Sequence, residues 1–302
     1  MQPPPPTESP AAPTPAFGPP RVMTGIGLAM CGYACFSVQD AIVKWLVADL
    51  PVFEILFARS IMIMLFAGLL AGPHVYGAAL RSRRKGALLG RGVLILAAWL
   101  SYYSAAKWLP LAELVTLYFA APIFVMVLSI LILKEKVTLA RWIAAGVGFA
   151  GVALASDPGG TVDLLPAAMV LGSAFLWAWT NVLVRIISRT EATATQMIAS
   201  NFIFAVGCAA ALPFLWVTPT VTQALLLLGL GVAGGAGQYF VFEGFRHAPA
   251  SAVAPFEYSA LVWAFIFGFA IWGDIPKAAV FGGAALIIAS GVGLLIAERR
   301  AG

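Results

Sequence analysis

Charged side chains inside long apolar stretches are the residues of this sequence with the greatest capacity for chemistry. They are Asp40, Glu54, Arg59, Glu243 and Glu257. A charge in the hydrocarbon core of a bilayer costs about 2.5–3.5 kcal/mol on insertion scales. Such a group therefore needs a partner or a water-filled path. Its presence indicates binding of a charged solute or transfer of a proton, rather than the breaking of covalent bonds.

Glu257 is the strongest candidate among these charges. It stands in APFEYSALVW, about eight residues inside its apolar stretch. A lone Tyr or Gln at such a depth usually serves only in helix packing. Beside a buried Glu, however, Tyr and Gln side chains predict a largely apolar cavity with few polar groups to bind a solute. That cavity suits an amphipathic organic solute better than a sugar phosphate, which needs a Lys/Arg cluster at mid-depth. The residues predicted to line it are Trp99, Tyr102, Tyr103, Tyr118, Trp177, Asn181, Gln238, Tyr239, Glu257 and Tyr258.

Asp40 and Arg59 form a second candidate site. Arg59 lies about eight residues into its stretch, roughly 12 Å deep at 1.5 Å per residue, and Asp40 lies toward the same membrane side. We expect the two to pair, either as an outer gate or substrate-charge contact, or as a buried pair that only holds helices together. Glu54 and Glu243 lie within about two turns of their helix ends. Two alternatives therefore stand for each carboxylate: it reaches water, or it is buried.

The elements that position these residues follow from composition. Hydrophobic residues make up 61% of the 302 residues, charged residues 10%, and the mean hydropathy is +0.94. Soluble domains average about 45–50% apolar and about 25% charged, so the sequence predicts an all-α integral membrane protein. Apolar runs of about 20 residues, without alternation, argue against a β-barrel. The predicted transmembrane helices span about 22–46, 51–71, 87–107, 111–133, 138–156, 164–187, 195–217, 221–246, 250–272 and 276–297.

The basic residues predict the orientation. With the N-terminus inside, fourteen of the eighteen Lys and Arg residues, Arg91 among them, fall on the inner side, in loops or near helix ends. Lys44, Lys107 and Lys277 fall outside. The positive-inside rule then puts both termini in the cytoplasm and accounts for the net charge of +5 without nucleic acid. Residues 1–20 carry nine prolines and one charge, which predicts a disordered cytoplasmic tail and no signal peptide.

The two halves of the chain resemble each other. An offset of 139 residues pairs Lys107 with Arg246, Pro110 with Pro249, Tyr118 with Glu257 and Glu135 with Asp274. A near-constant offset indicates duplication of one five-helix unit, at 21–156 and 164–297. Because five is odd, the second copy enters the membrane inverted. Inverted repeats are typical of transporters that bind substrate near the midplane between the halves.

Each half is similar to the EamA-type unit of the drug/metabolite transporter superfamily. The resemblance rests on Pro122, on Glu135 thirteen residues later, and on the glycine-rich GVGFAGVALA that follows from Gly146. In the second half Leu261 replaces the proline, which weakens a proline break there, and Asp274 holds the acidic position. The resemblance covers about residues 22–297 and implies ten transmembrane helices and transport. Length and span number are similar to bacterial amino-acid and metabolite exporters, the YddG-type amino-acid exporters among them.

Signatures of other functions are absent from the sequence. It has no H-E-x-x-H, no G-x-S-x-G and no Cys/His cluster, so we predict no enzyme, no metal and no cofactor. Gly146, Gly148 and Gly151 spell G-x-G-x-x-G, but mid-span they indicate close helix packing rather than nucleotide binding. The same interpretation applies to the glycines of 229–237.

The sequence therefore predicts a multi-pass secondary transporter of the bacterial inner membrane. Its partners are the lipid bilayer and a small organic solute, with amino acids or related metabolites first, moved outward by alternating access. A passive channel or facilitator, and an efflux carrier for other metabolites or drugs, are the alternatives. The solute, the direction, the energy coupling and the oligomeric state, including a homo-oligomer, are open at this stage.

Overall fold

The computed structural model describes residues 21–105, 108, 117–156, 164–273 and 278–301, and every regular element in these ranges is a helix. One short element is π-helical (η1) and one is 3₁₀ (η2). The elements are α1 (Val22–Leu46), α2 (Val52–Ala71), α3 (His74–Arg81), α4 (Lys85–Ala105), α6 (Ala121–Leu128), η1 (Ser129–Leu133), α7 (Leu139–Ser156), α8 (Leu164–Ile187), α9 (Thr193–Ala209), α10 (Leu212–Leu215), α11 (Val221–His247), α12 (Ala250–Val253), η2 (Ala254–Tyr258), α13 (Ser259–Trp272) and α14 (Ala278–Ala301).

Most helix ends match the sequence prediction, and local chemistry explains them. Gly72 and Gly273 follow α2 and α13 with φ of 83° and 69°, a conformation that glycine adopts without steric cost. A capping box of Thr220 and Gln223 begins α11. The predicted tail 1–20, together with Lys107, Pro110, Asp274 and Lys277, lies outside the described residues.

The structure corrects the predicted spans in three places. The short helix α3 was not predicted, and the span expected at 195–217 ends at Ala209, before the separate turn α10. The span expected at 250–272 is divided by the 3₁₀ segment η2. Leu261 in place of the family's proline weakened the expectation of a proline break in that span. The break occurs instead at Pro255, which has no N–H to donate to the preceding turn.

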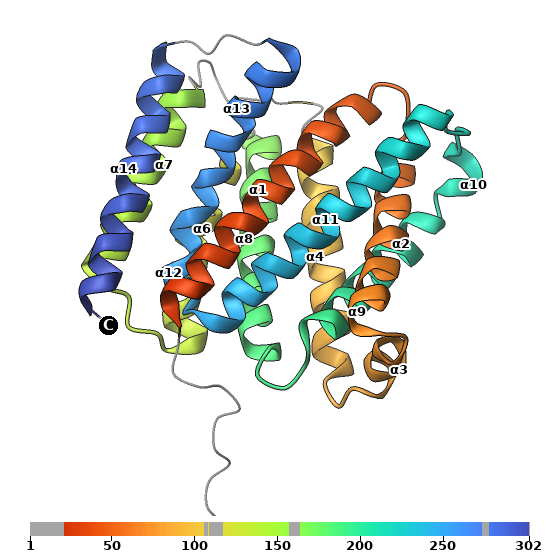
Figure 1. Ribbon diagram of the computed structural model, residues 1–302, viewed down its shortest axis with the longest axis horizontal. Coiled ribbons are helices and arrows are strands. Elements are labelled where there is room, and N and C mark those ends of the chain that lie inside the picture. Colours follow the sequence, from red (N-terminus) through yellow and green to blue (C-terminus); the bar gives the residue numbers. More distant parts are fainter. Residues whose placement is uncertain (1–20, 106–107, 109–116, 157–163, 274–277, 302) are drawn as a thin grey trace, which may run out of the picture.

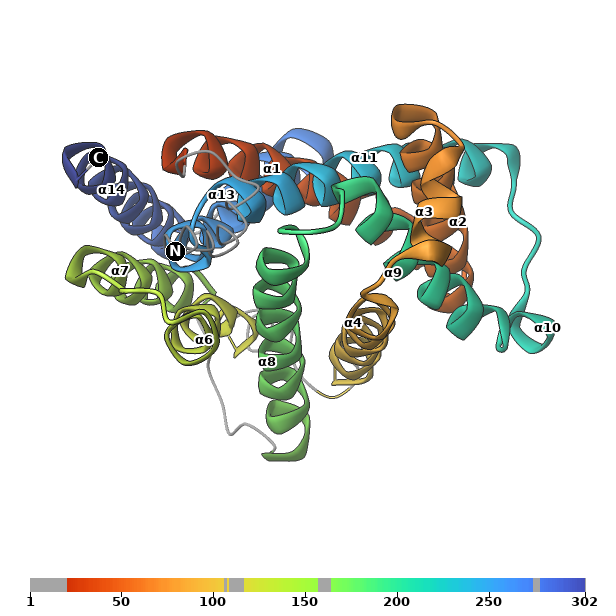
Figure 2. The same cartoon turned by 90° about the horizontal axis from the view of Figure 1, so that it is seen from below.

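The helices pair across the two halves of the chain (Figure 1). The most extensive packing joins α1 with α11. The pair α4 with α8 is its counterpart, because both pairs join the first and third long helices of opposite halves. The helix α2 packs on α9 at one edge of the bundle, and α7 packs on α14 at the other (Figure 2). Because α1 begins and α14 ends at the same end of the bundle, we refer to that end as the terminal end.

The outer surface of the bundle is apolar, as a lipid-facing surface must be. Leu69, Leu164 and Phe214 are 86%, 87% and 85% exposed, values that would be costly in water. Among the described residues, five helices are long and apolar enough to cross a membrane: α1, α2, α8, α11 and α14. The protein is therefore an all-α, multi-pass membrane protein.

Glycines set the closest helix contact, between α1 and α11. A Cβ atom on Gly244 would lie 2.9 Å from the carbonyl oxygen of Gly25, and one on Gly237 would lie 3.1 Å from that of Gly32. Both glycine pairs are seven residues apart on their helices, so one face of each helix approaches the other along two turns. This confirms the packing interpretation of the small residues on α11.

The G-x-G-x-x-G motif of α7 is also a packing motif, at two of its three glycines. A Cβ atom on Gly151 would lie 2.7 Å from the carbonyl oxygen of Gly283 on α14, and one on Gly148 would overlap the Tyr258 ring. Gly146 has open space around it.

We expect Gly244→Ala to destabilise the protein by about 1–3 kcal/mol, because the added methyl meets backbone atoms of α1 that cannot rotate away. Thermal unfolding of the purified chain in detergent measures this. Gly27→Ala on α1 is the matched control, since a Cβ there meets nothing within 4 Å. Equal melting temperatures for the two variants would contradict the proposed role of the contact.

Candidate solute site

Glu257 lies in the 3₁₀ break η2 and is 5% exposed. Its Oε1 accepts a hydrogen bond of 2.7 Å from the indole Nε1 of Trp177 on α8. The two side chains come from positions 80 residues apart, so the contact exists only in the folded bundle. Transporters commonly bind substrate at such helix discontinuities, where backbone and side-chain polar groups face the centre of the protein.

Several buried polar atoms around Glu257 have no hydrogen-bond partner among the described residues. They include the second carboxylate oxygen of Glu257, the hydroxyl of Tyr33 on α1 and the side-chain nitrogen of Asn181 on α8. Asn181 lies one turn from Trp177, on the same face of α8. Tyr33 interacts electrostatically with Glu257. Unsatisfied buried polar atoms are costly, so their gathering at one place indicates a site for a polar ligand group or water.

Aromatic residues of the first half complete this region. Tyr118 interacts electrostatically with Glu257, its partner in the repeat offset. The Tyr118 ring contacts that of Tyr102 at 5.0 Å between centroids. Trp99 belongs to the same apolar cluster as Trp177. The side chain of Tyr103 lies outside the described part of the structure.

Three of the predicted cavity residues have their main contacts elsewhere. Gln238 accepts a hydrogen bond of 2.8 Å from Asn201 on α9. Tyr239 lines an apolar pocket of about 430 Å³ formed by α2, α9 and α11. Tyr258 is fully buried and packs against Phe119 and α7. Consecutive side chains along a helix point in different directions, which explains why the Tyr258 side chain packs in a different place from that of Glu257.

Arg59 has a partner that the sequence analysis missed. Its Nε donates a hydrogen bond of 2.7 Å to the Gln39 side chain, and its guanidinium lies over the Trp99 ring at 5.6 Å. Asp40 is exposed and interacts electrostatically with Arg59 and with the side chain of Gln39. A Cβ atom on Gly234 would lie 2.5 Å from the Gln39 oxygen, so this glycine of α11 makes room for the contact.

We expect Asp40 and Arg59 to be energetically coupled. Asp40→Asn and Arg59→Gln should each lower stability or transport, because each leaves a charge without its counterpart in a low-dielectric region. The double variant should be less impaired than the sum of the two, by about 0.5–3 kcal/mol in a double-mutant cycle. Strict additivity, in a cycle that also includes Gln39→Leu as a control for the neutral contact, would show that the two charges act independently.

The two acidic residues whose exposure was open are both buried. Glu54 is 1% exposed, and its Oε2 accepts a hydrogen bond of 3.0 Å from the backbone N–H of Val217. Glu243 accepts from Thr193 and pairs with Arg246 at 3.3 Å on its own helix. Both carboxylates therefore hold helices together near the ends of the bundle rather than simply reaching water.

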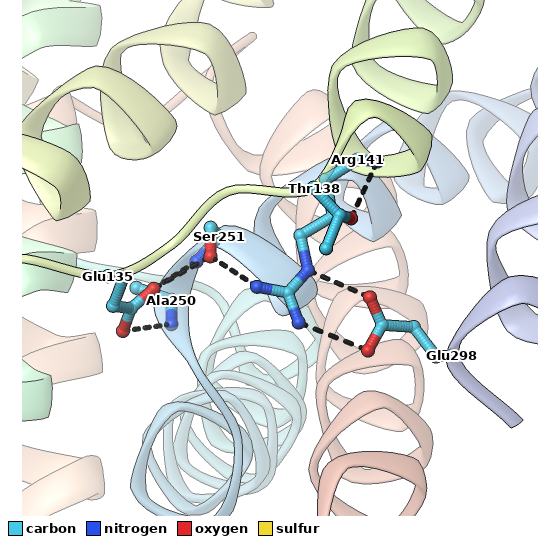
Figure 3. Close-up of polar contacts among 6 residues, drawn as sticks. All are labelled: Glu135, Thr138, Arg141, Ala250, Ser251 and Glu298. Atoms are coloured by element: carbon cyan, nitrogen blue, oxygen red, sulfur yellow. Dashed lines mark hydrogen bonds and ion pairs between the residues drawn. The ribbon is translucent and has the colours of Figure 1, made fainter. Parts of the chain in front are cut away.

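A polar cluster joins the two halves at the terminal end (Figure 3). Glu135, just after η1, accepts hydrogen bonds of 3.1 Å from the backbone N–H groups of both Ala250 and Ser251 and one of 2.7 Å from the Ser251 hydroxyl. Arg141 donates 2.9 Å to the same serine and forms a two-point ion pair with Glu298 on α14, at 2.8 and 3.1 Å. The acidic position of the family motif thus caps the first turn of the broken span.

Arg91 is the largest departure from the sequence prediction. We counted it among inner-surface charges, but it is 2% exposed, on α4, where it contacts α9 and α11. The predicted span at 87–107 already contained Arg91, which was the sequence signal that it lies inside a helix. No group of three or more metal-binding side chains occurs in the described ranges.

Comparison with known proteins decides the family. The profile of the EamA-like transporter family matches residues 23–157 and 164–296, one match in each half. The chain belongs to the EamA-like transporter family. The two matches together cover most of the chain.

Characterised relatives of this EamA-like chain are transporters of small molecules. The S-adenosylmethionine uptake transporter of Rickettsia conorii is 27% identical over 286 residues, which are 92% of this chain and 95% of the relative. The pseudopaline exporter CntI of Pseudomonas aeruginosa is 30% identical over 276 residues, 90% of this chain and 95% of that one. A crystal structure with 20% identity superimposes with a TM-score of 0.78 over 92% of this chain and 97% of its own.

The protein is therefore a transporter of small molecules and not an enzyme, as the sequence indicated. Its fold is shared with the solved relative, and its membership in the drug/metabolite transporter superfamily is confirmed.

Proposed function

We propose that this chain is a secondary transporter of the bacterial inner membrane that exports amino acids or related amine-bearing metabolites. The observation that carries the proposal is the buried Glu257 carboxylate, with one oxygen held by Trp177 and the other without a partner in the described structure. A buried carboxylate needs a cation or a proton. An ammonium group of a solute supplies that cation, and the surrounding Tyr and Trp side chains suit its apolar part.

The relatives support an amine-bearing solute and leave the direction to experiment. S-adenosylmethionine, named for the rickettsial relatives, is itself an amino-acid derivative, and those proteins are named for uptake. The Pseudomonas relative is named as an exporter. Both directions are compatible with one fold because a secondary transporter follows the gradient of its solute or of a coupled ion.

Alternating access between two inverted five-helix repeats is the mechanism that we propose. The pairing of α1 with α11, α4 with α8, α2 with α9 and α7 with α14 supports it, because an internal two-fold axis produces these pairs. The contacts of Glu135 and Arg141 close the terminal end, while Glu257 lies in the interior. Breaking that cluster then opens the site toward the terminal end, and remaking it closes that end.

A counterflow screen of the purified chain in proteoliposomes tests the function. The labelled solutes are amino acids, S-adenosylmethionine, nucleosides and quaternary amines. We expect saturable accumulation of amine-bearing amino-acid solutes against an unlabelled internal pool. Non-saturating leak would favour a facilitator, and accumulation of nucleosides alone would overturn the proposed solute class.

Topology provides a separate test of the inverted-repeat arrangement. We expect a phosphatase fused after residue 302 to be inactive and a fluorescent protein there to be bright, since the Lys/Arg excess places both termini in the cytoplasm. The same pair of fusions at residue 48, in the turn after α1, is the control and should give the reverse pattern. An active phosphatase at residue 302 would contradict the orientation.

A further inference from the structure

Arg91 is a buried cation that lacks a carboxylate partner and one hydrogen-bond acceptor among the described residues. Its side chain lies between α4 of the first half and α9 and α11 of the second. One Nη donates 2.7 Å to the Ser200 hydroxyl, and the guanidinium lies 4.3 Å from the centroid of the Phe242 ring. Its Nε has no hydrogen-bond partner, and no carboxylate pairs with it, within the described ranges. A buried arginine usually pairs with an anion, because an uncompensated one costs several kcal/mol.

The neighbours of Arg91 hold it in one orientation. Ser200 donates its own proton to the backbone oxygen of Gln196 at 2.6 Å, so its lone pairs face the guanidinium. The Phe242 ring covers one face of the plane. These contacts leave the Nε edge for another acceptor, and a carboxylate is the group whose two oxygens match adjacent N–H groups of a guanidinium. On α9, one turn before Ser200, the side-chain oxygen of Gln196 is also buried without a hydrogen-bond partner in the described structure.

We propose that Arg91, held by Ser200 and Phe242, is a carboxylate-binding subsite of the transport path. Arg91 lies six residues past Lys85, the first residue of α4, which is roughly 9 Å along the helix at 1.5 Å per residue. It receives the acidic group of a solute. The site lies at the interface between the two halves, so it opens when that interface separates at the terminal end.

This inference rests on the proposed function, and its test separates the two. The probes are leucine, methionine and phenylalanine, each paired with its C-terminal amide. Acid and amide share the side chain and the ammonium group, and differ in the carboxylate. Counterflow in proteoliposomes gives the ratio of acid to amide uptake for each pair.

We expect the wild-type chain to favour the acids at least tenfold, and Arg91→Gln to remove that preference while leaving uptake of the amides. Arg91→Lys should restore part of it, because an ammonium supplies the charge without the fork. Ser200→Ala should lower the preference by a smaller factor. Arg189→Gln, which removes an exposed arginine, is the matched control and should behave as the wild type.

A second measurement keeps folding apart from binding. Thermal unfolding in detergent should show Arg91→Gln to be as stable as the wild type or more stable, because an unpaired buried charge is removed. An unchanged acid-to-amide ratio in Arg91→Gln, or a wild type that takes up the amides as well as the acids, would overturn the subsite while the proposed function stands. Uptake of neither member of any pair would overturn both.

Discussion

Glu257→Gln is expected to reduce transport of amine-bearing solutes by roughly thirtyfold or more while the protein remains folded. The amide oxygen of glutamine still accepts from the Trp177 indole, so the contact of 2.7 Å between η2 and α8 is retained. What is lost is the negative charge that balances an ammonium group. Truncating one partner of a buried charge pair costs about 2–5 kcal/mol, and about 2 kcal/mol corresponds to this factor.

Two controls separate charge from geometry in this experiment. Trp177→Phe removes the hydrogen bond and keeps the carboxylate, and it should cost less than Glu257→Gln. Asp49→Asn removes an exposed carboxylate in the turn after α1 and should have no effect. The readouts are counterflow for affinity and thermal unfolding for the fold.

Transport by Glu257→Gln also distinguishes substrate binding from proton transfer. If Glu257 binds the ammonium group, the variant loses affinity for amines at every pH. If Glu257 carries a proton, the variant exchanges solute normally, but its net flux no longer depends on pH. Wild-type affinity, selectivity and pH profile in both Glu257→Gln and Glu257→Ala would place the site elsewhere.

Arg141→Met is expected to destabilise the protein by about 3–5 kcal/mol, the largest effect on stability that the structure predicts. Arg141 is 7% exposed, and its guanidinium forms two contacts with Glu298 and one with Ser251 (Figure 3). Removing it leaves the Glu298 carboxylate buried without its partner. Because these residues connect α7 with α12 and α14, the terminal end should also open more readily.

The double variant Arg141→Met with Glu298→Leu checks the cause. It should be more stable than Arg141→Met alone, because the orphaned carboxylate is gone. Arg299→Met, on the exposed residue next to Glu298, is the matched control and should shift the melting temperature little. A melting temperature of Arg141→Met equal to that of Arg299→Met would show that the ion pair contributes nothing.

Much of the fold could be read from the sequence because a bilayer allows few structures. Every backbone polar group in hydrocarbon must be paired within its own segment, so runs of about 20 apolar residues specify helices. The predicted spans at 22–46 and 164–187 match α1 and α8 residue for residue. The offset of 139 residues also paired Tyr118 with Glu257, two residues that interact electrostatically in the folded chain.

The sequence did not predict the helix breaks or the lateral contacts. Pro255 marks the break of the ninth span, but a proline in a membrane helix is compatible with a kink, a cap or a continuous helix. Only the packing of η2 against α1, α6 and α7 selects the 3₁₀ turn that presents Glu257 to Trp177. Helix breaks depend on what covers the freed backbone groups, and this is decided by neighbours distant in the chain.

By itself, the sequence determined the class of protein and the similarity of its two halves, and it singled out Glu257 as the candidate carboxylate of the site. The tertiary structure alone decided which charges are paired. Arg91 and Arg141 have similar places near helix starts, yet one lies against Phe242 without a carboxylate in the described structure and the other forms a two-point ion pair with Glu298. The pattern of apolar residues indicates how strongly each residue avoids water. It carries no information about which residue of another helix packs against it.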